Sequence, residues 1–232
     1  MNLINDRVSE DAFGFRSILE LGGGEPVGHT TAPPNLCVAS SLSEFSLIES
    51  PLKNIMLHFW QPSAALRQLI AQTNFEDLPE YEAIIDCADL SQVILDQKNS
   101  LCRQFFRQFA EIFQAFAVIS KSESLNIQLC KTAEQPCPLF HVDRLKYRLL
   151  CTLRGPGTEW LDDRAVRRKF LGRGNNRKIV RHEAVVYEVE PFQVCILKGE
   201  AFRGGYGRGV VHRSPPVPPA VGGRWYLRVD IG

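Results

Sequence analysis

The hydrophobic periodicity of the chain changes near residue 120, and this change limits the folds that it can adopt. From Phe105 to Phe116, large apolar residues recur every three or four positions, which places them on one face of a helix. We predict a helix over residues 89–119 whose aromatic stripe packs on the core; a partner-binding face is the alternative. After Lys121, apolar and polar residues alternate, as they do in half-buried strands.

The second half of the chain contains short segments rich in Val, Ile, Leu, Tyr and Phe, separated by Gly, Pro and Asn. We expect residues 121–232 to form an all-β barrel or sandwich with the helices packed on its outside, which is an α+β arrangement. The expected strands lie within residues 125–131, 147–155, 184–190, 192–199, 209–214 and 224–231.

The first part of the chain, residues 1–120, is predicted to be irregular and helical. Glycines at 22–24 and prolines at 33–34 interrupt regular structure in the first 50 residues. A short helix is expected over 62–72, because Pro62 suits a first helical turn. We expect this part and the β-rich part, residues 121–232, to belong to one continuous domain.

Cysteine usage and hydropathy favour a cytoplasmic protein. The seven cysteines are odd in number and widely spaced, without a CxxC pair, which suits free thiols in a reducing compartment. No apolar run approaches the roughly 20 residues that span a bilayer. The first residues lack the basic and apolar regions of a secretory signal. We therefore expect no membrane contact.

Basic residues are concentrated in one segment, although the formal net charge of the chain is only +1. Residues 164–181, RAVRRKFLGRGNNRKIVR, could meet phosphates or an acidic partner, or could form a solvated loop. The segment has one aromatic residue, Phe170, whereas single-stranded nucleic acid is usually bound by several stacking side chains. A nucleic-acid partner is therefore the least favoured of the functions considered.

Two imidazoles and one carboxylate stand in positions that suit a metal site. His141 and Asp143 are two residues apart, and residues i and i+2 of a strand point to the same face. His212 lies in GVVHRSPP, at the end of a later predicted strand. An isolated HxD pair at a strand end is common without a metal. Together, the three side chains make a known ligand set for one divalent ion.

The last predicted strand, RWYLRVDI, carries two arginines on one face. Arg224 and Arg228 alternate with the apolar Trp225 and Leu227, so burial of the apolar face against the helices turns both arginines inward. A buried guanidinium is costly unless it meets an anion. A carboxylate ligand would satisfy it through charge-assisted hydrogen bonds.

The order HxD, then His, then Arg on the next strand resembles the iron(II)/2-oxoglutarate-dependent oxygenases over residues 125–232. The resemblance implies a double-stranded β-helix, or jelly-roll barrel, with Fe(II) and 2-oxoglutarate as cofactors. It implies that His141, Asp143 and His212 are the catalytic metal ligands and leave positions open for cosubstrate and oxygen.

The same resemblance implies a cosubstrate site. Arg224 would bind the distal carboxylate of 2-oxoglutarate. Arg228 is the next candidate, because a long turn with four prolines separates His212 from Arg224. Tyr147, which we place on the same face as the HxD pair, would add a hydrogen bond. The primary substrate, a small molecule or a protein, is not specified.

At a closer level, CPLFHVDRLKYRLLCTLRGPGTEWL together with VVHRSPP resembles a bacterial family described only as domain of unknown function 1826. Members are associated with zinc-responsive genes, which implies a competing function: a zinc-binding protein of a zinc-homeostasis response without oxygenase activity. Zn²⁺ accepts two His and one Asp, and Cys137 could be its fourth ligand or simply a small apolar residue. A closed site would be structural, whereas an open one could support hydrolysis.

Overall fold

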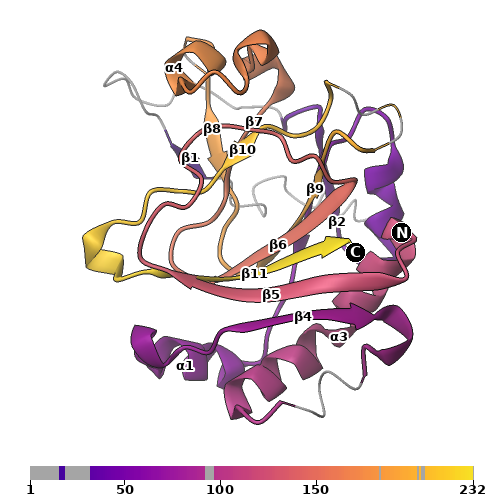
Figure 1. Cartoon of the computed structure of the whole chain (residues 1–232), viewed down its shortest axis with the longest axis vertical. Coiled ribbons are helices and arrows are strands. Elements are labelled where there is room, and N and C mark those ends of the chain that lie inside the picture. Colours follow the sequence, from indigo (N-terminus) through magenta and orange to yellow (C-terminus); the bar gives the residue numbers. More distant parts are fainter. Residues whose placement is uncertain are drawn as a thin grey trace, which may run out of the picture.

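The computed structural model describes residues 16–18, 32–91, 97–182, 184–202, 204 and 207–231, the first of these segments by its backbone alone. Within these residues the chain forms a mixed α/β fold with two sheets of four and seven strands (Figure 1). The glycines at 22–24 lie outside the described residues. No helix in the described part is both long and apolar enough to cross a membrane.

The larger sheet has the strand order β2-β3-β9-β6-β11-β5-β4. Neighbouring strands are antiparallel, except that β2 and β3 are parallel. The strands are β2 (Leu36–Ala39), β3 (Ile55–Phe59), β4 (Tyr81–Asp86), β5 (Ser124–Thr132), β6 (Tyr147–Arg154), β9 (Gln193–Lys198) and β11 (Arg224–Ile231).

The smaller sheet is antiparallel and has the order β1-β8-β7-β10. Its strands are short: β1 (Arg16–Ile18), β7 (Glu159–Leu161), β8 (Val186–Glu188) and β10 (His212–Arg213). One apolar cluster contains residues of both sheets, among them Trp160 and Tyr187 from the small sheet and Leu150 and Leu197 from the large one. The two sheets therefore pack face to face.

The long helix α3 (Ser100–Ser120) lies on the opposite face of the large sheet, as does α1 (Ala64–Gln72) (Figure 1). The helix begins at Ser100 because the side chain of Asn99 caps it. Asn99 Oδ1 accepts hydrogen bonds from the backbone N–H groups of Leu101 and Cys102. It ends where Lys121 adopts a left-handed conformation, with φ of 57°. The predicted aromatic face, from Phe105 to Phe116, is buried in the core cluster.

The predicted bounds of this helix were too long at the start. Residues 87–89 form a separate 3-10 turn, η4 (Cys87–Asp89), and α3 starts only at Ser100. Residues 92–96 lie outside the described part. The short helix expected over 62–72 is present as α1, which is capped by the hydroxyl of Ser63.

Of the barrel and the sandwich expected for residues 121–232, the structure has the sandwich: the strands form two facing sheets that are not closed into a barrel. The expectation of an irregular and helical first part is incomplete. Strands β2, β3 and β4 come from that part and hydrogen-bond into the same sheet as β5, β6, β9 and β11. Their pairing with distant strands is tertiary, and short edge segments carry little periodic signal of their own.

The basic segment 164–181 covers the outer face of the small sheet. It contains the turns η5 (Asp163–Ala165) and η6 (Arg168–Phe170) and the short helix α4 (Asn176–Ile179), seen beyond β7 and β8 in Figure 1. Val166 and Ile179 from this segment join Leu161, Val186 and Val211 of the sheet in a third apolar cluster. The segment is thus anchored to the fold by apolar contacts.

Candidate metal centre

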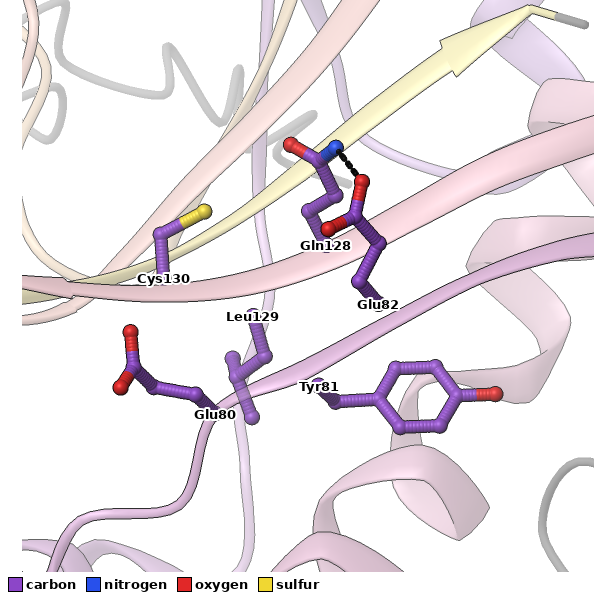
Figure 2. Close-up of a pocket in the computed structure, with 6 residues that line it drawn as sticks. All are labelled: Glu80, Tyr81, Glu82, Gln128, Leu129 and Cys130. Atoms are coloured by element: carbon purple, nitrogen blue, oxygen red, sulfur yellow. Dashed lines mark hydrogen bonds between the residues drawn. The ribbon is translucent and has the colours of Figure 1, made fainter.

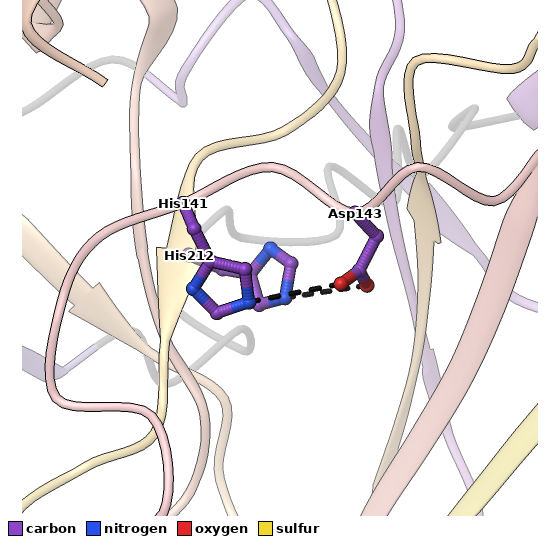
Figure 3. A group of neighbouring side chains, drawn as sticks. All are labelled: His141, Asp143 and His212. Carbon is purple, nitrogen blue, oxygen red and sulfur yellow. Dashed lines mark ion pairs between the residues drawn. The ribbon is translucent and has the colours of Figure 1, made fainter. Parts of the chain in front are cut away.

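The structure brings His141, Asp143 and His212 together from two distant parts of the chain (Figure 3). His212 opens strand β10. His141 pairs with it through an isolated antiparallel bridge, with His141 N donating to His212 O at 2.9 Å and His212 N donating to His141 O at 3.0 Å. The two rings consequently lie side by side, with centroids 4.6 Å apart.

The candidate ligand atoms of the three side chains lie within 4.8 Å of one another. His141 Nε2 is 3.6 Å from Asp143 Oδ1, and His212 Nε2 is 3.5 Å from Asp143 Oδ2. The overall spread is slightly wider than the 3–4 Å expected for atoms that share an ion. Figure 3 shows both rings directed toward the carboxylate. The arrangement can accept one divalent ion after a small closing movement.

Backbone carbonyls orient both imidazoles. Nδ1 of His141 lies 2.9 Å from the carbonyl of Leu139, and Nδ1 of His212 lies 3.2 Å from the carbonyl of Val210. A proton on Nδ1 would be shared with each carbonyl and would leave the lone pair of Nε2 free. The Nε2 atoms are those that face Asp143, so this tautomer suits metal binding.

The local environment sets the protonation of these groups. Burial lowers the pKa of His212 to about 4, so this imidazole is neutral near pH 7. Burial alone would raise the pKa of Asp143, but the nearby His141, His212 and Arg148 side chains lower it to about 2. The carboxylate of Asp143, whose Oδ1 lies 3.6 Å from Nε2, raises the pKa of His141. A metal ion would therefore meet a carboxylate and at least one neutral imidazole.

Arg148, on strand β6, is a charged neighbour that sequence reasoning did not single out. Its Nη1 donates to Asp143 Oδ2 at 2.8 Å, while Nε and Nη2 donate to the two carboxylate oxygens of Asp230 at 2.6 and 2.9 Å. One signal was available in the sequence: an arginine near the start of the apolar segment YRLLCTL needs an acidic partner when the strand is buried.

Arg224 is buried, with 2% of its surface exposed. Its Nη2 donates to the hydroxyls of Thr152 and Thr158 at 3.1 and 2.9 Å, and its guanidinium lies over the ring of Tyr226. Within the described residues its Nε has no hydrogen-bond partner and no carboxylate pairs with it. Burial lowers the pKa of Arg224 to about 10, which reflects the cost of an unpaired buried cation.

Arg228 has a different environment, although it shares a face of β11 with Arg224. Its Nε lies 3.3 Å from Asp230 Oδ2, and about a third of its side chain, 34%, is exposed. Arg228 is therefore neutralised by an acidic neighbour, whereas Arg224 is not.

Tyr147 does not lie near the metal centre, and its predicted place on the HxD face is wrong. It is fully buried in the core cluster that faces α3, and its hydroxyl has no hydrogen-bond partner among the described residues. Its neighbour Arg148 points to Asp143, and adjacent strand residues point to opposite faces. Residues 144–146 form a bend before β6, which breaks the alternation that we had extended from Asp143.

Trp160 is a second buried donor without a partner in the described part of the chain. Its indole Nε1 has no hydrogen-bond acceptor, and its ring stacks on Tyr187 with centroids 4.7 Å apart. Trp160 is the cross-strand neighbour of His212, so the two side chains share the face that looks toward the large sheet.

Cys137 is exposed and does not belong to the cluster of candidate metal ligands in the described chain. Its carbonyl accepts a hydrogen bond from Ser214 N, which ties this segment to the residues after β10. The cluster thus offers three candidate ligands, which is the pattern of an open site and differs from that of a closed structural zinc site.

Other polar features lie apart from this cluster. A hollow on strands β4 and β5 is lined by Glu80, Tyr81, Glu82, Gln128, Leu129 and Cys130 (Figure 2). In the basic segment, Arg164 and Arg168 pair with Asp162 and Asp163, while several other basic side chains are exposed, namely Lys169, Arg173, Arg177, Lys178 and Arg181.

The fold and the site together define a mixed α/β protein with two facing sheets and an open His–Asp–His cluster. The chain belongs to the family described as "Protein of unknown function (DUF1826)", whose model matches residues 41–230. The resemblance to this family that the sequence suggested is therefore confirmed. No curated protein matches the sequence significantly.

Similar solved structures include several oxygenases. A prolyl-4-hydroxylase from Pseudomonas putida is 13% identical, with 82% of this chain and 98% of that chain covered and a TM-score of 0.46. A protein assigned to the 2OG-Fe(II) oxygenase family from Caulobacter crescentus is 13% identical, with 87% of each chain covered and a TM-score of 0.44. One assigned as an oxygenase from Shewanella oneidensis is 10% identical, with 84% and 88% covered and a TM-score of 0.46. At this degree of similarity, function has to be inferred from the residues of the site.

Proposed function

We propose that the protein is an iron(II)/2-oxoglutarate-dependent oxygenase, built on a double-stranded β-helix, whose primary substrate is a small molecule or a protein. The observation that carries this proposal is a juxtaposition. Next to an open cluster of two imidazoles and a carboxylate, a buried arginine without a carboxylate partner binds Thr158, two residues from Trp160, which is the register partner of His212.

The proposed metal ligands are His141, Asp143 and His212. Two His and one carboxylate with remaining positions open form the facial triad of non-haem Fe(II) oxygenases. Iron at this triad supplies the activation of oxygen, coupled to decarboxylation of 2-oxoglutarate to succinate. The protein supplies deprotonated ligands, since His212 is neutral and Asp143 ionised near pH 7.

Arg224 is the proposed anchor for the distal carboxylate of 2-oxoglutarate. Its buried Nε has no acceptor among the described residues, and a carboxylate oxygen could accept a charge-assisted hydrogen bond from it. The hydroxyls of Thr152 and Thr158 hold the guanidinium in place. Arg228 is the weaker candidate, because Asp230 already neutralises it.

The strand register supports a short distance between anchor and metal ligands. Thr158, which binds Arg224, is two residues from Trp160, and Trp160 pairs with His212. Residues two apart on a strand are separated by about 6–7 Å. A short diacid could thus extend from Arg224 past Trp160 toward His212. The unpartnered indole N–H of Trp160 would be available to one of its oxygens.

The test is an anaerobic titration of the metal-free protein with Fe(II) and then 2-oxoglutarate. A visible charge-transfer band that needs both components, followed by succinate formation when oxygen is admitted, is the expected result. Tight zinc binding with no response to 2-oxoglutarate would contradict the proposal and favour a zinc protein. Binding of the diacid in a calorimeter, with succinate as a shorter control, gives a second readout that does not require turnover.

A further inference from the structure

We propose that Arg148 and Asp230 are positioning residues that hold the carboxylate of Asp143 so that it binds the metal through Oδ1 alone. This inference rests on the proposed metal centre and goes beyond it, because neither residue is itself a metal ligand. It explains how the site can keep positions open for cosubstrate and oxygen.

The evidence begins with the two oxygens of Asp143, which have unequal partners. Oδ2 accepts a charge-assisted hydrogen bond from Arg148 Nη1 at 2.8 Å. Oδ1 has no such donor, and lies 3.6 Å from His141 Nε2. A carboxylate oxygen already bound to a guanidinium is a poorer metal donor than its free partner, because the arginine draws on its lone pairs. Oδ1 is therefore the oxygen left for an ion.

Asp230 in turn holds Arg148 through a two-pronged contact. Nε and Nη2 of Arg148 bind Oδ1 and Oδ2 of Asp230 at 2.6 and 2.9 Å, which is the fork-to-fork geometry that fixes a guanidinium plane. This leaves Nη1 directed at Asp143. The two residues face each other across the β6–β11 pair, where Asp230 is the register partner of Arg148.

Burial makes this arrangement rigid. Only 17% of the Arg148 side chain, 11% of Asp143 and 12% of Asp230 are exposed, so solvent screens these ion pairs weakly. Arg228 lies 3.3 Å from Asp230 at the outer end of the row, so two arginines alternate with two carboxylates and their formal charges balance.

This geometry makes a chemical prediction about ligand number. With Arg148 in place, Asp143 donates one oxygen and the triad supplies three ligands. Without it, both oxygens of Asp143 are free, so the carboxylate can rotate or bind through both. Either change weakens the fixed site and removes a position that a cosubstrate needs. Substitution of a residue that hydrogen-bonds to a metal ligand typically lowers metal affinity about 10–100-fold.

The experiment uses Co(II) as a probe for the full chain, with affinity measured by calorimetry and ligand number followed by visible absorption. We expect Arg148→Met to raise the Kd for Co(II) about 10–100-fold and to change the absorption spectrum of the bound ion. Arg148→Lys should restore only part of the affinity, because an ammonium cannot bind both carboxylates in the same plane. Asp230→Asn should shift both readouts in the same direction.

The matched control is Arg154→Lys, on the same strand. Arg154 donates to the carbonyl of Thr73 and touches neither carboxylate, so its variant should bind Co(II) with the native spectrum. If Arg148→Met does not fold, Arg148→Lys and Asp230→Asn carry the test. Because the two residues act as one unit, the effects of Arg148→Lys and Asp230→Asn should not add when combined.

Two failures are distinguishable. If His141→Ala abolishes Co(II) binding while the Arg148 and Asp230 variants keep native affinity and spectrum, the positioning role is wrong and the metal centre stands. If His141→Ala itself leaves Co(II) binding unchanged, the proposed metal centre is wrong.

Discussion

His141 and His212 exchange a reciprocal pair of backbone hydrogen bonds, of 2.9 and 3.0 Å, although about 70 residues separate them in the chain. This bridge extends the small sheet by one residue beyond β10 and places both imidazoles on the same side. Asp143 follows His141 by two residues and faces both rings. The two imidazoles are thus placed by backbone pairing, whereas the carboxylate of Asp143 is held by a hydrogen bond from Arg148.

Removal of any of the three candidate ligands should abolish tight metal binding. We expect His141→Ala, Asp143→Ala and His212→Ala each to raise the Kd for Fe(II) or Co(II) by more than about 100-fold. This exceeds the loss of affinity usual for a residue that only hydrogen-bonds to a metal ligand. His182→Ala is the control, because His182 is exposed and outside the cluster. Calorimetric titration of the three variants and of the control measures these Kd values. Native affinity in any of the three variants would exclude that residue as a ligand.

Arg224→Ala should weaken binding of 2-oxoglutarate while leaving metal affinity almost unchanged. Loss of a buried charge-assisted contact costs about 2–5 kcal/mol, which is a rise in Kd of tens-fold to thousands-fold. Arg224→Lys should recover only part, since an ammonium lacks the planar fork. Anaerobic titration with 2-oxoglutarate measures the Kd of each variant. A larger effect from Arg228→Ala would move the anchor to that residue, and no effect from either would make both arginines structural.

Metal affinity should fall as the pH falls below the pKa of His141. The nearby carboxylate of Asp143 raises this pKa above the ordinary value of 6.5, so the ring is protonated below it and the metal must displace that proton. His212, with a pKa of about 4, stays neutral over the same range, and Asp143 stays ionised. We expect the Kd to rise about tenfold per pH unit on the acid side. Calorimetry in two buffers of different ionisation enthalpy should find about one proton released there; release of two would show that His212 titrates as well.

Tyr147→Phe should leave 2-oxoglutarate binding unchanged. The side chain of Tyr147 belongs to the core cluster that contains α3, on the other side of the sheet from Arg148, and its hydroxyl is buried without a partner among the described residues. An unsatisfied buried polar group costs about 1–3 kcal/mol, so its removal should leave the free energy of unfolding equal or higher. Denaturant unfolding of the metal-free protein and a 2-oxoglutarate titration test the two parts. A loss of cosubstrate affinity would return Tyr147 to the site.

Periodicity predicted the regular parts of this fold because that signal is local. The alternating segments at 125–131, 147–155, 192–199 and 224–231 correspond to β5, β6, β9 and β11. The aromatic stripe of α3 is buried against the same sheet. Each of these elements has one face in the core, and its residues record that burial at a period of two or about 3.6.

The candidate ligands could also be proposed from the sequence, since residue type and order limit which side chains can bind a metal. The orientation of Tyr147 could not be predicted, because the bend at 144–146 resets the alternation between Asp143 and β6. The choice between Arg224 and Arg228 was equally open. Both lie on one face of β11, and only their surroundings differ: Thr152 and Thr158 meet one, and Asp230 meets the other.

The sequence by itself therefore determined the helices α1 and α3, the strands β5, β6, β9 and β11, the apolar face of each, and which residue types can bind a metal. Tertiary structure alone decided that β2, β3 and β4 complete the large sheet, that the two sheets stay unjoined, and that Arg148 lies between Asp143 and Asp230. The physical reason is the distance along the chain over which each interaction acts. Periodicity follows from the burial of one segment, whereas strand partners, ion pairs and the absence of a counter-charge depend on residues that only the folded chain brings together.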